Sequence, residues 1–176
     1  GELYDTTESD VWQDGILGAG IRLDGINDRF SFPDHGGERK TFSLWFDPGF
    51  ALEDNGTAVR LLSGNGGARS IWLNDFNSSI SGEILGFRNH NTGEMTYVTA
   101  ANANFSDGWN HLALVWDGGL TRYRVYVNGV VVDVNASAQG HFNFWGAQNN
   151  TQFGFPLTAN GDVRYAGKID EIRLYE

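Results

Sequence analysis

Short segments in which apolar and polar residues alternate recur along the chain. Ile21 and Leu23 are separated by charged residues, and the same period of two returns at residues 29–32 and 41–46. Alternation with this period turns one face of an extended strand toward a core and the other toward solvent or a second layer. No window sustains apolar residues at helical spacing, and 24 glycines interrupt the sequence. The pattern therefore predicts β-strands throughout.

The clearest predicted hairpin covers residues 122–134. Asn128 and Gly129 supply the two positive-φ positions that a tight type I′ turn requires. At the end of the chain, the apolar residues within 169–175 depart from period two, which predicts a β-bulge near Asp170. Many short strands with regular turn signals are typical of an all-β sandwich made of two antiparallel sheets.

Length and composition fit one domain spanning residues 1–176. The chain is 40% apolar and 14% aromatic, which is enough to bury a sizeable core. It contains no cysteine, and this excludes a disulfide scaffold, a cysteine-based zinc site and a thiol nucleophile. Because a strand-like run reaches the last residues, we expect the domain to be excised from a larger extracellular protein.

The charge balance narrows the possible partners. The formal net charge is −10, from 22 acidic and 12 basic residues. Such a surface repels phosphate backbones and anionic lipids, so we expect neither a nucleic acid partner nor membrane insertion. No apolar run approaches the length of a membrane-spanning segment.

Five blocks of the sequence, taken in chain order, carry a family resemblance. They are LDGINDRFSFP (23–33), FSLWF (42–46), DGWNHLALVWDG (107–118), YVNG (126–129) and GKIDEIRLY (167–175). Together they resemble the laminin-G-like jelly rolls of the concanavalin A-like lectin and glucanase superfamily, over nearly the whole chain. The resemblance implies a concanavalin A-like jelly roll, but the superfamily includes carbohydrate-binding modules, adhesin domains, neurexin-like binders, glycanases and lyases.

Catalytic patterns known in this superfamily do not appear in the chain. Its glycanases carry Glu-x-Asp-x-x-Glu on one strand, and this sequence has no such triplet. A polysaccharide lyase would need a Tyr or His base beside an Arg or Gln. His111 lies within a fold block and is expected to be packed structurally, whereas His35 and His90 lie in loops rich in Gly or Asn. We therefore expect a protein that is not an enzyme.

Aromatic and amide side chains are interleaved in the segment 141–155. Sugars present both an apolar face and a polar rim, so their sites combine stacking aromatics with amides and charged groups. The alternative is that the phenylalanines of this segment only pack inward. The predicted ligand contacts are Trp145, Asn143, Gln148, Asn149 and Trp72, the last on an expected strand at 70–73.

Calcium is the ion that the composition favours, because oxygen ligands are plentiful and cysteine is absent. Members of the superfamily often hold calcium against the sandwich. Asp24 and Asp28 lie in the same tight turn. Asp170 lies at the predicted bulge, and a bulge changes the direction in which a side chain points. These three are the predicted metal ligands. A second possible loop site combines Asn74 with Asp75 and Asn77.

The sequence thus predicts a carbohydrate-binding, lectin-like module of an extracellular or cell-surface bacterial protein, either an adhesin or a polysaccharide-active protein, with a possible Ca²⁺ dependence. Its expected partner is a glycan or polysaccharide. The alternative is a laminin- or neurexin-type adhesion domain that binds a cell-surface protein, and a glycanase or polysaccharide lyase is the least favoured reading.

Overall fold

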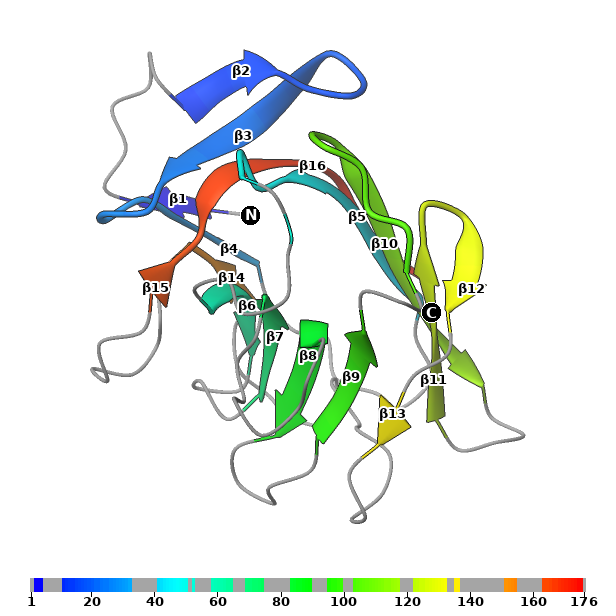
Figure 1. Cartoon of the computed structure of the whole chain (residues 1–176). Helices are drawn as coiled ribbons and strands as arrows, with labels where there is room; N and C mark the ends of the chain where they lie inside the picture. Colours follow the sequence, from blue (N-terminus) through cyan, green and yellow to red (C-terminus); the bar gives the residue numbers. More distant parts are fainter. Residues whose placement is uncertain are drawn as a thin grey trace.

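The computed structural model consists of β-strands arranged in two packed sheets (Figure 1). It describes residues 2–4, 11–32, 41–50, 52, 58–64, 69–74, 83–89, 95–99, 103–117, 122–132, 135–136, 151–154 and 163–175. Among these residues, no helix has the length and apolar character needed to cross a lipid bilayer.

The larger sheet has nine strands in the described part of the chain. In spatial order they are β1 (Glu2–Tyr4), β4 (Arg29–Phe32), β14 (Thr151–Phe153), β6 (Val59–Gly64), β7 (Arg69–Leu73), β8 (Glu83–Asn89), β9 (Met95–Thr99) and β13 (Asn135–Ala136), with β15 (Val163–Arg164) also on β6. All pairs are antiparallel except β15 with β6, which is parallel.

The second sheet has seven strands and arches over the first in Figure 1. Its spatial order is β12 (Val130–Val132), β11 (Arg122–Val127), β10 (Asn110–Asp117), β5 (Thr41–Asp47), β16 (Ala166–Tyr175), β3 (Ala19–Asp24) and β2 (Trp12–Asp14). Strands far apart in sequence are therefore direct neighbours, since β16 lies between β5 and β3. The predicted two-sheet antiparallel jelly roll is confirmed, with the short parallel pair as its one departure.

Alternating side chains from both sheets fill one hydrophobic core. Phe42, Leu44 and Phe46 point inward from β5, and Ile71 and Leu73 point inward from β7. Each of these five side chains is fully buried. The inward set follows the period-two pattern of the sequence, because successive residues of a strand face opposite sides.

The two local features predicted from the sequence are present. Asn128 and Gly129 both have positive φ, 51° and 79°, at the turn that joins β11 to β12. The register of β16 against β5 shifts between Asp170 and Arg173, and Glu171 at that bulge has φ 49°. Both the tight hairpin and the bulge are therefore confirmed.

Candidate functional site

A continuous row of polar residues crosses the outer face of the nine-stranded sheet, the side that is turned away from the core. The pairing registers place one residue per strand in this row. From β4 to β8 its members are Ser31, Gln152, Ser63, Ser70 and Arg88. Neighbouring strands are about 4.8 Å apart, so adjacent members of such a row touch or share hydrogen bonds.

A second row runs beside the first and contains an arginine stacked on a tryptophan. From β15 to β9 its members are Arg164, Arg60, Trp72, Gly86 and Tyr97. The Arg60 guanidinium lies 4.5 Å from the centroid of the Trp72 ring, a cation–π contact. Gly86 contributes no side chain between the two aromatic residues. We call these two rows together the outer polar face.

Hydrogen bonds tie the two rows to each other. The indole Nε1–H of Trp72 donates to Ser70 Oγ at 2.5 Å, and Arg60 Nη1 donates to Ser63 Oγ at 3.4 Å. The serines of the first row therefore hold the arginine and the tryptophan of the second. A bulge in β6 between Arg60 and Leu62 keeps Arg60 on the same face as Trp72 while the leucines point into the core.

The outer polar face is buried although it lies outside the hydrophobic core. Trp72 is only 2% exposed and Arg60 only 6%, yet neither belongs to the core cluster. Gln152 is 9% exposed, and its Oε1 has no hydrogen-bond partner among the described residues. A buried amide oxygen without a donor loses free energy relative to water.

The aromatic and amide segment predicted to bind the ligand lies outside the described residues. Trp145, Asn143, Gln148 and Asn149 all belong to it, so their roles stay predictions. Trp72, the fifth predicted contact, is part of the outer polar face. Its ring is enclosed by neighbouring side chains, with Arg60 over it, so it supports this face in the described conformation rather than offering an open stacking surface.

Two of the predicted metal ligands shape the turn between β3 and β4. Asp24 Oδ1 accepts hydrogen bonds from the backbone N–H groups of Ile26, Asn27 and Asp28, and Asp28 Oδ2 accepts one from Asp24 N–H. Burial raises the pKa of Asp24, but these backbone hydrogen bonds outweigh it, and the pKa lies below its ordinary value. The two carboxylates thus act as turn caps.

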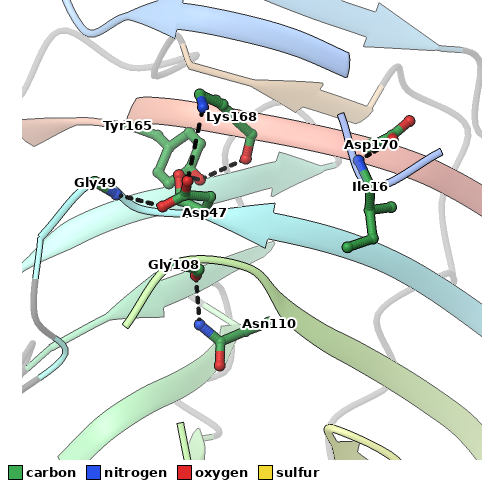
Figure 2. Close-up of polar contacts among 8 residues, drawn as sticks. All are labelled: Ile16, Asp47, Gly49, Gly108, Asn110, Tyr165, Lys168 and Asp170. Atoms are coloured by element: carbon green, nitrogen blue, oxygen red, sulfur yellow. Dashed lines mark hydrogen bonds and ion pairs between the residues drawn. The ribbon is translucent and has the colours of Figure 1, made fainter. Parts of the chain in front are cut away.

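Asp170 is the third predicted metal ligand, and it ties the β2–β3 turn to β16. Its Oδ2 accepts hydrogen bonds from Ile16 N–H at 2.9 Å and Leu17 N–H at 3.1 Å, and Figure 2 shows the first of these. Its Oδ1 accepts a hydrogen bond from Glu171 N–H at 2.7 Å. A side chain added to Gly15 would meet Asp170 Oδ2 at 2.4 Å, so the glycine permits this approach.

The three carboxylates do not form one calcium site. Ala166 pairs with Asp24 and Ile169 with Ile21, so Asp170 lies four residues, about 13 Å, along β16 from the position opposite Asp24. Two carboxylates separated by that distance do not coordinate the same ion. Among the described residues, no group of three or more His, Asp or Glu side chains is placed to hold a metal ion. Of the alternative cluster only Asn74 is described, with φ 62°. The described residues therefore do not fit the predicted calcium site.

His111 is packed on the outer face of the seven-stranded sheet. Its ring lies against Trp45, with centroids 5.0 Å apart. Partial burial, and then the charge of Arg173, lower the pKa of His111 below its ordinary value. The structural role predicted for this histidine is confirmed, while His35 and His90 lie outside the described residues.

The topology and the layered core define a lectin-like jelly-roll sandwich. A laminin-G-type family model, described as the concanavalin A-like lectin/glucanases superfamily, matches residues 24–176. The chain belongs to this family. No curated protein sequence matches it.

Solved structures share the fold at low sequence identity. Domain 4 of AbnA, a GH43 extracellular arabinanase from Geobacillus stearothermophilus solved with arabinotriose, is 23% identical; the match has a TM-score of 0.64 and covers 94% of this chain and 74% of that one. The CBM40 of the Ruminococcus gnavus IT-sialidase, bound to α2,3-sialyllactose, is 18% identical with a TM-score of 0.52, covering 89% and 88%. A pentraxin from Limulus polyphemus is 16% identical with a TM-score of 0.52, covering 83% and 67%.

Sequence reasoning missed most of the outer polar face. Ser63, Ser70, Arg60 and Gln152 come from three strands that are separated in the sequence, and only the strand order brings them together. One local signal was available: Ser70 and Trp72 alternate with Ile71 and Leu73, so a polar and aromatic face could be expected on that strand.

Proposed function

We propose that this chain is a carbohydrate-binding module and that its glycan contacts the partly exposed members of the outer polar face, Arg88, Tyr97 and Arg164. The observation that carries the proposal is the fixed polar layer that adjoins these three residues in the two rows, where Ser63 and Ser70 hold the Arg60–Trp72 stack. A tyrosine ring stacks on the apolar face of a sugar, and its hydroxyl and the guanidinium groups of Arg88 and Arg164 offer hydrogen-bond partners to the sugar hydroxyls.

The charges on this face support binding without turnover. At the outward positions of the nine-stranded sheet whose side chains are described, the charged residues are Arg29, Arg60, Arg88 and Arg164. Glycoside hydrolysis requires two carboxyl groups flanking the scissile bond. The described face therefore offers groups that hold and orient a sugar.

Similarity to glycan-binding domains also supports the proposal. Two of the solved structures above were determined with arabinotriose and with sialyllactose, and both come from proteins that act on glycans. We accordingly place the chain in an extracellular or cell-surface protein.

The test compares Tyr97→Ala with Tyr175→Ala on a glycan array and by calorimetry. Tyr175 is the matched control, because it is exposed on β16 of the opposite sheet. Loss of a stacking aromatic ring predicts a roughly three- to tenfold weaker affinity for Tyr97→Ala, at about 0.5–1.5 kcal/mol per aromatic contact. Thermal unfolding of both variants confirms that they are folded. Equal affinities for the two variants, or no glycan binding by the unsubstituted domain, would refute the proposal.

The proposal includes calcium only through a measurement of whether glycan binding depends on Ca²⁺. The array is repeated with a chelator, and an unchanged profile would remove Ca²⁺ from the function. A chelator effect would mean that an ion is bound without Asp24 and Asp170 acting together, because these two carboxylates are too far apart for one ion.

Protein binding is the second candidate function. The residues on the outer face of the seven-stranded sheet are the observation that favours it. One row across that face contains Val131, Tyr126, Ala113, Ser43 and Arg173. Val131 is 55% exposed, and Tyr126 and Arg173 supply the residue types that dominate protein interfaces. If no glycan bound the unsubstituted domain and Tyr126→Ala abolished its adhesion to a protein partner, this candidate would replace the first.

A further inference from the structure

The turn between β11 and β12 contains Asn128 followed by Gly129, a pair of residues with a chemistry of its own. The backbone nitrogen that follows an asparagine can attack the side-chain carbon Cγ, and a glycine leaves this approach unhindered because it has no side chain. The N–Cγ bond forms, the Cγ–Nδ2 bond breaks, and ammonia leaves with the proton of the attacking N–H. Water then opens the cyclic imide to an aspartate or an isoaspartate.

The attacking group of this reaction is accessible in the folded protein. Gly129 is exposed at the tip of the hairpin, so a solvent base reaches its N–H. Both residues have positive φ, 51° and 79°, as a two-residue turn of this kind requires. Any restraint on the reaction therefore acts through the side chain of Asn128.

Three hydrogen bonds hold the Asn128 amide against the start of β10. Its Oδ1 accepts from His111 N–H at 2.8 Å, and its Nδ2 donates to the Asn104 carbonyl and to Asn110 Oδ1, each at 3.0 Å. Asn110 is fully buried, so this partner is itself fixed. The Cγ of Asn128 does not turn toward the nitrogen of Gly129 until these bonds break.

The same contacts leave the departing nitrogen without a proton donor. To leave as ammonia, Nδ2 must gain a proton, but the two groups that it contacts are acceptors, the Asn104 carbonyl and Asn110 Oδ1. From this arrangement we propose that Asn128 is a latent deamidation site: the folded hairpin suppresses the reaction, and local opening of the hairpin releases it. The inference is independent of the proposed carbohydrate binding.

The completed reaction would prevent the hairpin from closing as before. The new carboxylate still accepts from His111 N–H, but it brings no N–H to the Asn104 carbonyl or to Asn110 Oδ1, and it places a negative charge beside both oxygens. An isoaspartate also lengthens the backbone by one atom, which a two-residue turn does not accommodate. Deamidation therefore records irreversibly that a molecule has opened at this turn.

The experiment compares the folded domain with the domain unfolded in urea, both in the same mildly alkaline buffer. Peptide mapping by mass spectrometry follows conversion at Asn128, and the Asn-Gly pairs that begin at Asn55, Asn65 and Asn160 are internal references in urea. In urea Asn128 should react at the rate of these references. In the folded domain it should react at least about tenfold more slowly than in urea, because several hydrogen bonds must break first.

Two variants separate the side-chain restraint from other effects of folding. Asn110→Ala removes one acceptor of the Asn128 amide and should speed the reaction in the folded domain by about three- to tenfold. Asn104→Ala is the matched control, because Asn104 contributes only its backbone carbonyl, and the rate should stay within about twofold. Near-ultraviolet circular dichroism confirms that both variants are folded.

A second pair of variants tests the effect of the product and does not depend on the folding of Asn110→Ala. Asn128→Asp should lower the thermal unfolding temperature by about 2–4 °C, as expected for the loss of one hydrogen bond. Asn104→Asp introduces the same charge at an exposed side chain and should leave this temperature unchanged.

Three results would overturn the inference. The first is an equal rate at Asn128 in the folded and the unfolded domain. The second is an absence of reaction at Asn128 in urea while the three reference pairs react. The third is a folded Asn110→Ala variant in which Asn128 reacts no faster than in the unsubstituted domain.

Discussion

The amide of Asn128 donates a hydrogen bond from Nδ2 to Asn110 Oδ1 at 3.0 Å, and this bond joins two blocks of the family signature. Asn128 also accepts from His111 N–H through Oδ1 at 2.8 Å and donates from Nδ2 to the Asn104 carbonyl. The turn that closes the β11–β12 hairpin is thereby fixed to the loop that leads into β10. The family resemblance of these residues thus has a structural cause.

Asn110→Ala should be strongly destabilising. The side chain is fully buried, and it donates to the carbonyls of Ser106 and Gly108 as well as accepting from Ser106 N–H (Figure 2 shows the bond to Gly108). Removing it leaves several part-buried backbone groups without this partner and a cavity at a fully buried position, so we expect a loss of about 2–4 kcal/mol in the free energy of unfolding. Urea denaturation measures this. Asn104→Ala is the control, since Asn104 contributes only its backbone carbonyl to the network and should change stability by less than about 0.5 kcal/mol.

Asp170→Ala should release the turn at residues 15–18. The carboxylate is the acceptor for the N–H groups of Ile16 and Leu17, so both amides should exchange with deuterium much faster in the variant. The stability cost should be about 1–3 kcal/mol, as for other hydrogen bonds to a charged group. Asp107→Ala, at an exposed position, should leave the exchange of both amides unchanged. If these two amides stayed equally protected from exchange in the Asp170 variant, the role of this carboxylate in holding the turn would be contradicted.

Tyr165 should make the protein less stable at alkaline pH. Its hydroxyl lies within hydrogen-bonding distance of the carbonyls of Asp47, 2.9 Å, and Lys168, 2.8 Å (Figure 2). Complete burial, and then the charge of Asp47, raise the pKa of Tyr165 well above its ordinary value. A raised pKa means that the stabilisation is fully present below about pH 10 and is lost as pH rises through the higher folded value.

Tyr165→Phe tests that dependence. Phenylalanine does not titrate, so the decline of stability above about pH 10 should be shallower in the variant, with a cost of about 1–2 kcal/mol at neutral pH from the lost hydrogen bond. Denaturant unfolding across the alkaline range measures both quantities. Tyr175→Phe, at an exposed position at the end of β16, is the control, and an alkaline slope altered only in that variant would contradict the assignment.

Trp145→Ala should abolish or greatly weaken glycan binding without lowering the thermal unfolding temperature. The prediction follows from the aromatic and amide pattern of the segment 141–155, because exposed loop aromatics commonly stack on sugars. Trp12→Ala, at an exposed position on β2, is the control and should leave binding intact. Equal losses of binding and stability in Trp145→Ala would show that the indole belongs to the core.

Local patterns were sufficient to predict the strands, the hairpin and the bulge. Each depends on residues close in sequence, such as Asn128 with Gly129, whose conformations short-range sterics decide. The outer polar face depends instead on pairings such as Gln152 with Ser63, across 89 residues of sequence that carry no pairing signal. From the sequence, Asp24 and Asp170 were equally plausible metal ligands. Composition does not show that backbone N–H groups already donate hydrogen bonds to their carboxylates.

The position of β16 between β5 and β3 constrains the order of assembly. Until β16 is synthesised and docks, neither neighbour has its partner on that side, and the core beneath them remains open to water. Pairings of such long sequence separation slow folding, because the loop entropy is lost before the contacts form. The nascent chain therefore passes through a stage at which most of its strands exist without a closed sheet, when chaperones would protect it from aggregation.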